Sequence, residues 1–180
     1  KLAAEQDYLL AQKHLGYIYH TFKKDIKNAI HYLTLAANHN DAESQFGLGN
    51  MYFEKKNNPY RDVKIAMHYW TLAANQNNSE AQTQLGTIYH DGDENISPDI
   101  TKSIYYLTLA ANQNHPYALY YLGVDYFSGY HIPRDMNLAL HYFQLAANLN
   151  EPIANKILGD IFYDGKYVTK DISKAIHYYT

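Results

Sequence analysis

Cysteine is absent from this sequence of 180 residues. Without thiols the chain can form neither disulfide bridges nor cysteine-ligated zinc or iron–sulfur centres, and it has no cysteine nucleophile. A continuous apolar run of about 18 residues is also missing, so no segment has the composition of a transmembrane helix.

An excess of positive charge is missing as well. Lysine and arginine total 15 against 18 aspartate and glutamate residues, which gives a formal net charge of -3 with histidine neutral. Nucleic-acid-binding proteins usually carry a basic patch, so this balance argues against a nucleic-acid partner. Hydrophobic residues make up 47% of the chain, and 20 residues are tyrosine. This composition is that of a folded chain rather than a disordered one.

The sequence is internally repetitive. The triplet Ala-Ala-Asn begins at Ala36, Ala73, Ala110 and Ala146, at intervals of 37, 37 and 36 residues. Two further markers keep the same order within each interval. They are the leucine of a Leu-Gly pair, at Leu15, Leu48, Leu85, Leu122 and Leu158, and an aspartate, at Asp25, Asp62, Asp99, Asp135 and Asp171. A fixed period of this length is the signature of a repeat protein.

The pattern of apolar residues in each repeat predicts two helices. Ala81, Leu85 and Ile88 recur at the spacing of one helical face, and the apolar residues after each repeated aspartate do the same. The aspartate is placed to cap the second helix by accepting a hydrogen bond from the first turn. Residues suited to a left-handed cap follow the helices, at Gly92, Gly129 and Gly165 and at Asn40, Asn77, Asn114 and Asn150. Pro116 and Pro152 stand where a first helical residue belongs.

The repeated pattern is Ala-x-x-x-Leu-Gly-x-x-Tyr-x-x-Gly, followed by Asp-x-x-x-Ala-x-x-Tyr-x-x-x-Ala-Ala. It resembles the Sel1-like repeat family, a relative of the tetratricopeptide repeats. The resemblance implies an all-α, right-handed α-solenoid with about four and a half two-helix repeats. The first repeat lacks four residues between Gly16 and Asp25, and Phe22 and Lys55 stand where a loop glycine belongs. We expect those two turns to follow different paths.

The small residues of the pattern indicate how the repeats stack. Alanine and glycine let helix axes approach closely, and a glycine inside a helix costs about 1 kcal/mol relative to alanine. The recurrence of that glycine therefore predicts a packing role. We expect the tyrosines of the second helices to fill the space between repeats; these are Tyr32, Tyr69, Tyr106, Tyr142 and Tyr178.

Both ends of the sequence fall inside a repeat. Residues 2–7 resemble the tail of a second helix, and the last repeat stops at Thr180 before its Leu-Ala-Ala segment. We expect residues 1–180 to form a single array cut from a longer one at both ends. The apolar surface at such ends could also make the isolated chain self-associate.

No pattern associated with catalysis or metal binding is complete. The sequence has no Gly-x-Ser-x-Gly, Ser-x-x-Lys or His-Glu-x-x-His motif. The segment from Asp91 begins like a calcium loop, but Ile96 and Lys102 stand where glycine and glutamate are required. One column of the second helices holds four histidines, which point outward in parallel rather than converging on a metal. They are His31, His68, His141 and His177. We expect no enzyme activity, no metal and no cofactor.

Positions that vary between repeats indicate a binding surface. In related repeats the first helices line the concave face, so the resemblance implies partner-binding residues at fixed offsets from the Leu-Gly pair. The candidates are Tyr17, Phe46, Asn50, Phe53, Tyr117, Tyr120, Val124, Phe127, Lys156, Asp160 and Tyr163. The same register places His90, Asp91 and Asp164 on this face.

The fourth repeat stands out because Tyr117, Tyr120, Val124 and Phe127 are all aromatic or apolar. An exposed cluster of this kind is typical of a binding site; the alternative is packing against an adjacent helix. Asp125 also departs from the repeat pattern, since the equivalent positions of the other repeats hold isoleucine or methionine. A carboxylate there is costly unless it is paired or solvated, so Asp125 either contacts a partner or lies in a locally open repeat.

These observations favour a non-catalytic scaffold or adaptor that binds a protein or peptide partner on its concave face. The alternative is a regulatory or targeting portion of a larger enzyme. A hydrolase is disfavoured because no triad, dyad or metal set appears. We expect neither nucleic acid nor a membrane to be contacted by this segment.

Overall fold

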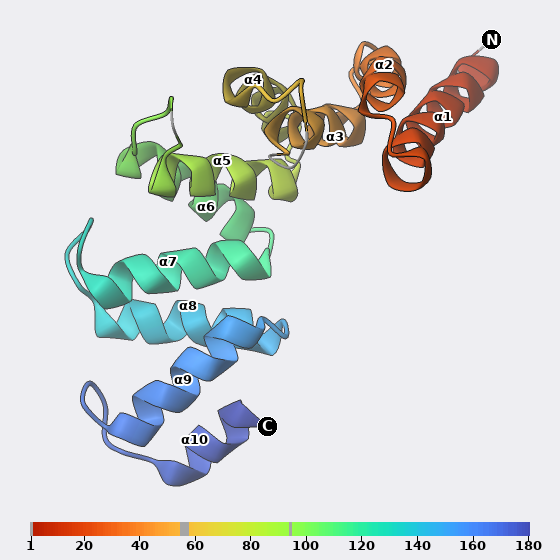
Figure 1. Ribbon diagram of the computed structural model, residues 1–180. Coiled ribbons are helices and arrows are strands. Elements are labelled where there is room, and N and C mark those ends of the chain that lie inside the picture. Colours follow the sequence, from red (N-terminus) through yellow and green to blue (C-terminus); the bar gives the residue numbers. More distant parts are fainter. Residues whose placement is uncertain (1, 55–57, 94) are drawn as a thin grey trace. The chain divides into compact units, whose positions relative to one another are not determined.

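The computed structural model describes residues 2–54, 58–93 and 95–180, and within these ranges its regular structure is helical (Figure 1). Ten α-helices follow one another along the described residues, and a π-helical turn extends the first. They are α1 (Leu2–Ile18) with the turn η1 (Tyr19–Lys23), α2 (Ile26–Ala37), α3 (Ala42–Phe53), α4 (Val63–Ala74), α5 (Ser79–Asp91), α6 (Ile100–Ala111), α7 (Pro116–Ser128), α8 (Met136–Asn148), α9 (Pro152–Asp164) and α10 (Ile172–Tyr179).

The chain divides into two compact units, residues 1–85 and 86–180. In the N-terminal unit α1 packs on α2 and α3 on α4, while α2 also contacts α3. In the C-terminal unit α7 packs on α8 and α9 on α10, and α6–α7 and α8–α9 are in contact as well (Figure 1). Helices thus stack in chain order within each unit, and the predicted all-α fold of two-helix repeats is confirmed. The single array over residues 1–180 stays a prediction.

Each hairpin is closed by its capping aspartate, as the sequence predicts. The Asp135 carboxylate accepts hydrogen bonds from the backbone N–H groups of Asn137 and Leu138 at 2.9 and 3.0 Å. The Asp135 backbone N–H in turn donates to the carbonyl oxygen of Tyr126 at 3.0 Å. The other four aspartates also cap their helices and donate to the aromatic residue that closes the preceding helix. One residue therefore fixes both the start of a helix and its link to the helix before it.

Stacked aromatic rings join the two helices of every hairpin. Each pair has ring centroids 5.4 to 6.0 Å apart and planes within 10° of parallel. The pairs are Tyr19–Tyr32, Tyr52–Tyr69, Tyr89–Tyr106, Tyr126–Tyr142 and Phe162–Tyr178. The sequence predicted that the second tyrosine of each pair fills the space between repeats. In the structure it instead stacks on an aromatic ring of its own hairpin.

The predicted turn residues have positive φ. The four asparagines lie between 58° and 65°, and the three loop glycines between 66° and 76°. Pro116 and Pro152 begin α7 and α9. The shortened first turn does follow a different path, because α1 continues into η1 and Lys24 takes the left-handed conformation with φ 54°. Lys55, the second exception, lies outside the described residues.

The small residues let helices of one hairpin touch. A Cβ added at Gly123 would lie 2.6 Å from the ring of Phe143, which is fully buried, and Gly49 faces the buried Trp70 in the same way. The paired alanines of the second helices are all buried, with at most 8% exposed. These columns are packed, but the glycines contact the second helix of their own hairpin, whereas the sequence predicted that they let neighbouring repeats stack.

Helix α1 is continuous from Leu2 to Ile18. Residues 2–7, which resemble the tail of a second helix, therefore belong to the same helix as the residues that follow them. Among the described residues, no helix combines the length and the apolar character that crossing a bilayer would require.

Candidate partner-binding surface

In the N-terminal unit, two candidate residues support the core. The Asn50 side-chain oxygen accepts a hydrogen bond from the indole N–H of Trp70 at 3.0 Å, and the Phe53 ring lies 5.1 Å from the indole. Trp70 is fully buried. Asn50 and Phe53 are themselves half-buried, so the structure assigns them a packing role that the repeat register alone did not indicate.

The other N-terminal candidates, Tyr17 and Phe46, are also half-buried. The Tyr17 hydroxyl donates to the carbonyl oxygen of Glu43 at 3.4 Å, and burial raises the pKa of Tyr17 to about 12. Lys13 Nζ lies 2.6 Å from the Glu43 carboxylate. Lys13, Tyr17 and Glu43 thus form a local polar network rather than a free apolar patch.

In the C-terminal unit, three tyrosines of α7 form a contiguous group, called here the tyrosine cluster: Tyr117, Tyr120 and Tyr121. Their ring centroids lie 5.0 to 5.7 Å apart. Tyr117 is 38% exposed and the other two are half-buried. Burial raises the pKa of both Tyr120 and Tyr121. The sequence did not indicate Tyr121, because the offsets counted from the Leu-Gly pair select Tyr120 and not the residue that follows it.

The remaining α7 candidates, Val124 and Phe127, contribute to the core as well as to the surface. Val124 and Phe127 are half-buried and pack against the core cluster of this unit. The Phe127 ring lies 6.2 Å from Phe143 and 5.2 Å from Tyr167. Packing against a neighbouring helix, the alternative raised from the sequence, therefore accounts for part of this cluster.

Phe127 also lines a small pocket of about 160 Å³ at the end of α9, called here the side-chain pocket. Ile157 and Ile161 add apolar wall, and Tyr167 comes from the loop between α9 and α10. Asp160 and Asp164 supply two carboxylates. Of these lining residues the sequence had placed Phe127, Asp160 and Asp164 on one face; the loop residue Tyr167 carried no such signal.

The three α9 candidates are polar and accessible. Lys156 Nζ lies 2.8 Å from Asp160 Oδ2, and the Tyr179 hydroxyl donates to Asp160 Oδ1 at 2.6 Å. These bonds, that from Lys156 first, lower the pKa of Asp160. Tyr163 is 55% exposed, with Lys170 Nζ 4.8 Å from its ring centroid.

Asp125 is paired and buried. Its Oδ1 lies 3.0 Å from Nε2 of His90, and only 1% of the residue is exposed. The other ring nitrogen, Nδ1, lies 2.6 Å from the Asp91 carboxylate. The hydrogen bond to Asp125, with that to Asp91, raises the pKa of His90 to about 9, so a charged imidazolium bridges two carboxylates at neutral pH. The expectation of a locally open repeat at Asp125 is therefore wrong.

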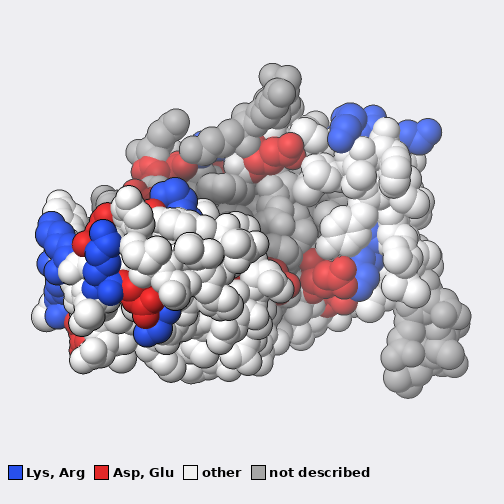
Figure 2. All heavy atoms as spheres, turned by 90° about the horizontal axis from the view of Figure 1, so that it is seen from below, with Lys and Arg blue, Asp and Glu red and all other residues white. Residues whose placement is uncertain are grey.

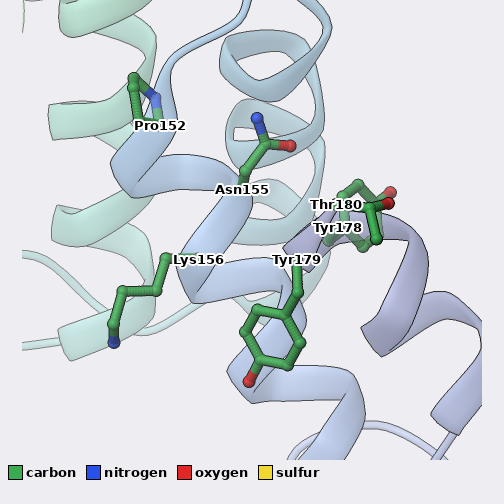
Figure 3. A pocket seen from close by; sticks show the side chains of 6 residues that line it. All are labelled: Pro152, Asn155, Lys156, Tyr178, Tyr179 and Thr180. Atoms are coloured by element: carbon green, nitrogen blue, oxygen red, sulfur yellow. The ribbon is translucent and has the colours of Figure 1, made fainter.

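A second pocket, of about 360 Å³, lies beside the C-terminal end of α10. Figure 3 shows Pro152, Asn155 and Lys156 of α9 on one side and Tyr178, Tyr179 and Thr180 on the other. In the earlier repeats, the residues that follow the position equivalent to Thr180 form one more helical turn, which ends in Ala-Ala. We assign no ligand to this space.

The charged groups do not assemble a metal centre within the described ranges, where no three potential ligands cluster. The four histidines of the second-helix column are exposed, each with its ring near the following tyrosine. In the segment that begins like a calcium loop, Glu94 lies outside the described residues. Figure 2 shows acidic and basic side chains interspersed on the face it presents, with uncharged areas between them.

Comparison with known proteins identifies the repeat. The Sel1 repeat pattern matches residues 9–41, 42–78, 79–115, 116–151 and 152–180. A protective antigen of uropathogenic Escherichia coli strains, described as displaying an SLR fold, is 27% identical over 99% of this chain, with a TM-score of 0.86. This chain spans 38% of that protein. No curated protein matches the sequence.

Two other solved structures are similar. A Sel1 repeat protein from Oxalobacter formigenes is 26% identical over 95% of this chain and 70% of its own, with a TM-score of 0.85. Cysteine-rich protein B of Helicobacter pylori is 24% identical over 78% of this chain and 99% of its own, with a TM-score of 0.58. The last likeness concerns the fold alone.

Proposed function

The chain belongs to the Sel1 repeat family, and on that premise we propose that it binds an extended protein segment on the first helices of its C-terminal unit. Sel1 repeat proteins are generally protein-interaction scaffolds. The binding surface proposed here comprises the tyrosine cluster of α7 and the side-chain pocket at the end of α9. The chain has no catalytic part in this proposal.

One observation carries the proposal: three tyrosine rings lie in mutual contact on one helix, and Tyr117 is 38% exposed. Tyrosine presents a large apolar ring with a polar end and loses little conformational entropy on binding, which makes it a frequent anchor in interfaces. The pocket lined by Phe127 and Ile157 adds a hollow for a partner side chain. Together they provide an anchor and a hollow on neighbouring first helices.

The cluster is also held rigidly. Tyr120 packs against Phe143, with ring centroids 6.5 Å apart. The Tyr121 hydroxyl lies 3.4 Å from Asp91, which itself bonds to His90. A surface that is ordered before binding loses less entropy when a partner docks. The buried His90–Asp125 pair supports the proposal in this way, because it ties α5 to the helix that carries the cluster.

The test compares two exposed tyrosines of the same unit. Tyr117→Ala removes the proposed anchor, whereas Tyr105→Ala removes a residue on α6 that is 59% exposed. Each protein is immobilised and used to select from a random peptide library displayed on phage, after circular dichroism has established equal helicity. We expect the wild type and Tyr105→Ala to enrich the same peptides and Tyr117→Ala to lose them. Equal enrichment by all three proteins, or none by the wild type, contradicts the proposal.

A further inference from the structure

The walls of the side-chain pocket combine apolar surface with negative charge. Phe127, Ile157, Ile161 and Tyr167 form most of the lining, and the two charged residues among the six are both aspartates. No lysine or arginine lines it. An aliphatic chain that ends in a positive charge matches both features, because its stem packs on apolar side chains while its charge reaches a carboxylate.

The two aspartates differ in their partners. Asp160 is compensated, since Lys156 binds one carboxylate oxygen and the Tyr179 hydroxyl the other. Asp164 is exposed and makes no hydrogen bond or ion pair with any described residue. The negative charge that is left for a ligand at this pocket is therefore that of Asp164.

The backbone adds to this potential. Asp164 is the last residue of α9, a helix of 13 residues capped by Gly165. The unpaired carbonyl groups at a helix C-terminus carry partial negative charge and favour a nearby cation. A carboxylate at this end gains nothing from the helix dipole, so its position there is unfavourable unless a cation compensates it.

The first helices of this unit are acidic as a group. Across residues 86–91, 116–128 and 152–164, all of which are described, Lys156 is the only lysine or arginine. The aspartates in the same stretches are Asp91, Asp125, Asp160 and Asp164. Asp125 is 99% buried and its Oδ2 has no hydrogen-bond partner among the described residues. His90 neutralises one charge of this set, so the surface retains a negative balance.

Two cations contact the ring of the pocket residue Tyr167 rather than Asp164. Arg134 and Lys166 lie over the Tyr167 ring, 5.5 and 5.1 Å from its centroid. Lys170 lies over Tyr163. These contacts indicate that the ring of the pocket residue Tyr167 already attracts positive charge.

We propose that the side-chain pocket selects a lysine or arginine of the partner segment, with its aliphatic stem against Ile157 and Ile161 and its charge at Asp164. The inference rests on the proposed function, and it adds the chemistry of the partner. The partner is then a basic segment whose neighbouring residues contact the tyrosine cluster.

The experiment uses the composition of the selected peptides. Wild type, Asp164→Asn and the control Glu80→Gln select from the same displayed library. Glu80 is an exposed first-helix carboxylate of the N-terminal unit, so its variant changes the net charge equally. We expect the wild-type and Glu80→Gln peptides to share a lysine or arginine at one position. We also expect Asp164→Asn to bind the wild-type consensus peptide about five- to tenfold more weakly, and added salt to weaken wild-type binding.

The outcomes separate the two proposals. Wild-type peptides without a shared basic residue, or equal affinity for Asp164→Asn and Glu80→Gln, overturn the assignment of the pocket and leave the proposed function standing. A wild type that enriches no peptide overturns both. An unchanged circular dichroism spectrum and melting temperature of Asp164→Asn establish that the comparison concerns binding rather than folding.

Discussion

His90 Nε2 lies 3.0 Å from Asp125 Oδ1, and this pair joins the last turn of α5 to the middle of α7. Equivalent positions in the other repeats hold Met51, Ile88 and Ile161, which are buried, and Ile18, which is 43% exposed. The fourth repeat therefore has a charged pair at a position where the other repeats have an apolar side chain. A buried hydrogen-bonded pair fixes geometry more strictly than an apolar contact does, because the hydrogen bond requires a defined distance and direction between its donor and its acceptor.

Breaking this pair from the histidine side should destabilise the C-terminal unit. His90→Ala leaves the Asp125 carboxylate buried without a counter-ion, which costs about 3 kcal/mol in free energy of unfolding, since the His90 side chain keeps slight access to solvent. Asp125→Ile restores the residue type of the equivalent positions and should cost less. Urea unfolding followed by circular dichroism compares the two midpoints, and a midpoint for His90→Ala equal to that of the wild type would argue against the pair.

The same pair predicts a pH dependence. Hydrogen bonding to Asp125 raises the folded-state pKa of His90 to about 9, above the unfolded value of about 6.5. The stabilisation from the pair is then fully present below pH 6.5 and is lost as the pH rises toward 9. Thermal melts across this range should show a falling melting temperature that His90→Gln flattens. An NMR titration that placed the His90 midpoint near the unfolded value would be incompatible with the charged bridge.

The glycine of the Leu-Gly pair should not tolerate a methyl group. Gly123→Ala places a Cβ 2.6 Å from the Phe143 ring, and overpacking of this kind costs about 1–3 kcal/mol. Alanine gains up to about 1 kcal/mol in helix propensity, so the net change should remain destabilising. Gly47→Ala is the matched control, because its nearest neighbour is the hydroxyl end of Tyr17 at 3.0 Å. Equal melting temperatures for the two variants would remove the packing role of Gly123.

The alanine column makes a parallel prediction in the N-terminal unit. Ala74 is 6% exposed near the end of α4, so Ala74→Leu should overpack the interface and lower the free energy of unfolding by about 1–3 kcal/mol. His68→Leu, on an exposed position of the same helix, should change it by no more than about 0.5 kcal/mol. Denaturation of both variants measures the difference, and an Ala74→Leu protein as stable as the control would show that the column does not pack.

The helices and their ends could be predicted from the sequence because their causes are local. Asp135 caps the residues that follow it, and Asn114 takes its left-handed conformation from the turn in which it lies. These effects act within a few residues and recur at every repeat, so the period of the sequence identified them. The packing role of Gly123 followed from the same periodicity.

The candidate surface could be predicted only in part, because its contacts join residues far apart in the chain. The register placed His90 on the binding face and Asp125 in an apolar column, yet gave no indication that they are paired across 35 residues. Asn50 was a binding candidate by position, whereas its hydrogen bond to Trp70 depends on a tryptophan at a position where the other repeats hold leucine, phenylalanine or tyrosine. Tyr167 enters the pocket from a loop whose path no periodic signal describes.

NMR mapping of a selected peptide onto the chain tests the central claim most directly. A peptide selected by the wild-type protein is added to the ¹⁵N-labelled chain, and the amide shifts are followed to saturation. Binding to the first helices of the C-terminal unit predicts the largest changes in α7 and α9, with Tyr117 and Asp164 among them. Changes confined to the second helices α8 and α10 would contradict the account.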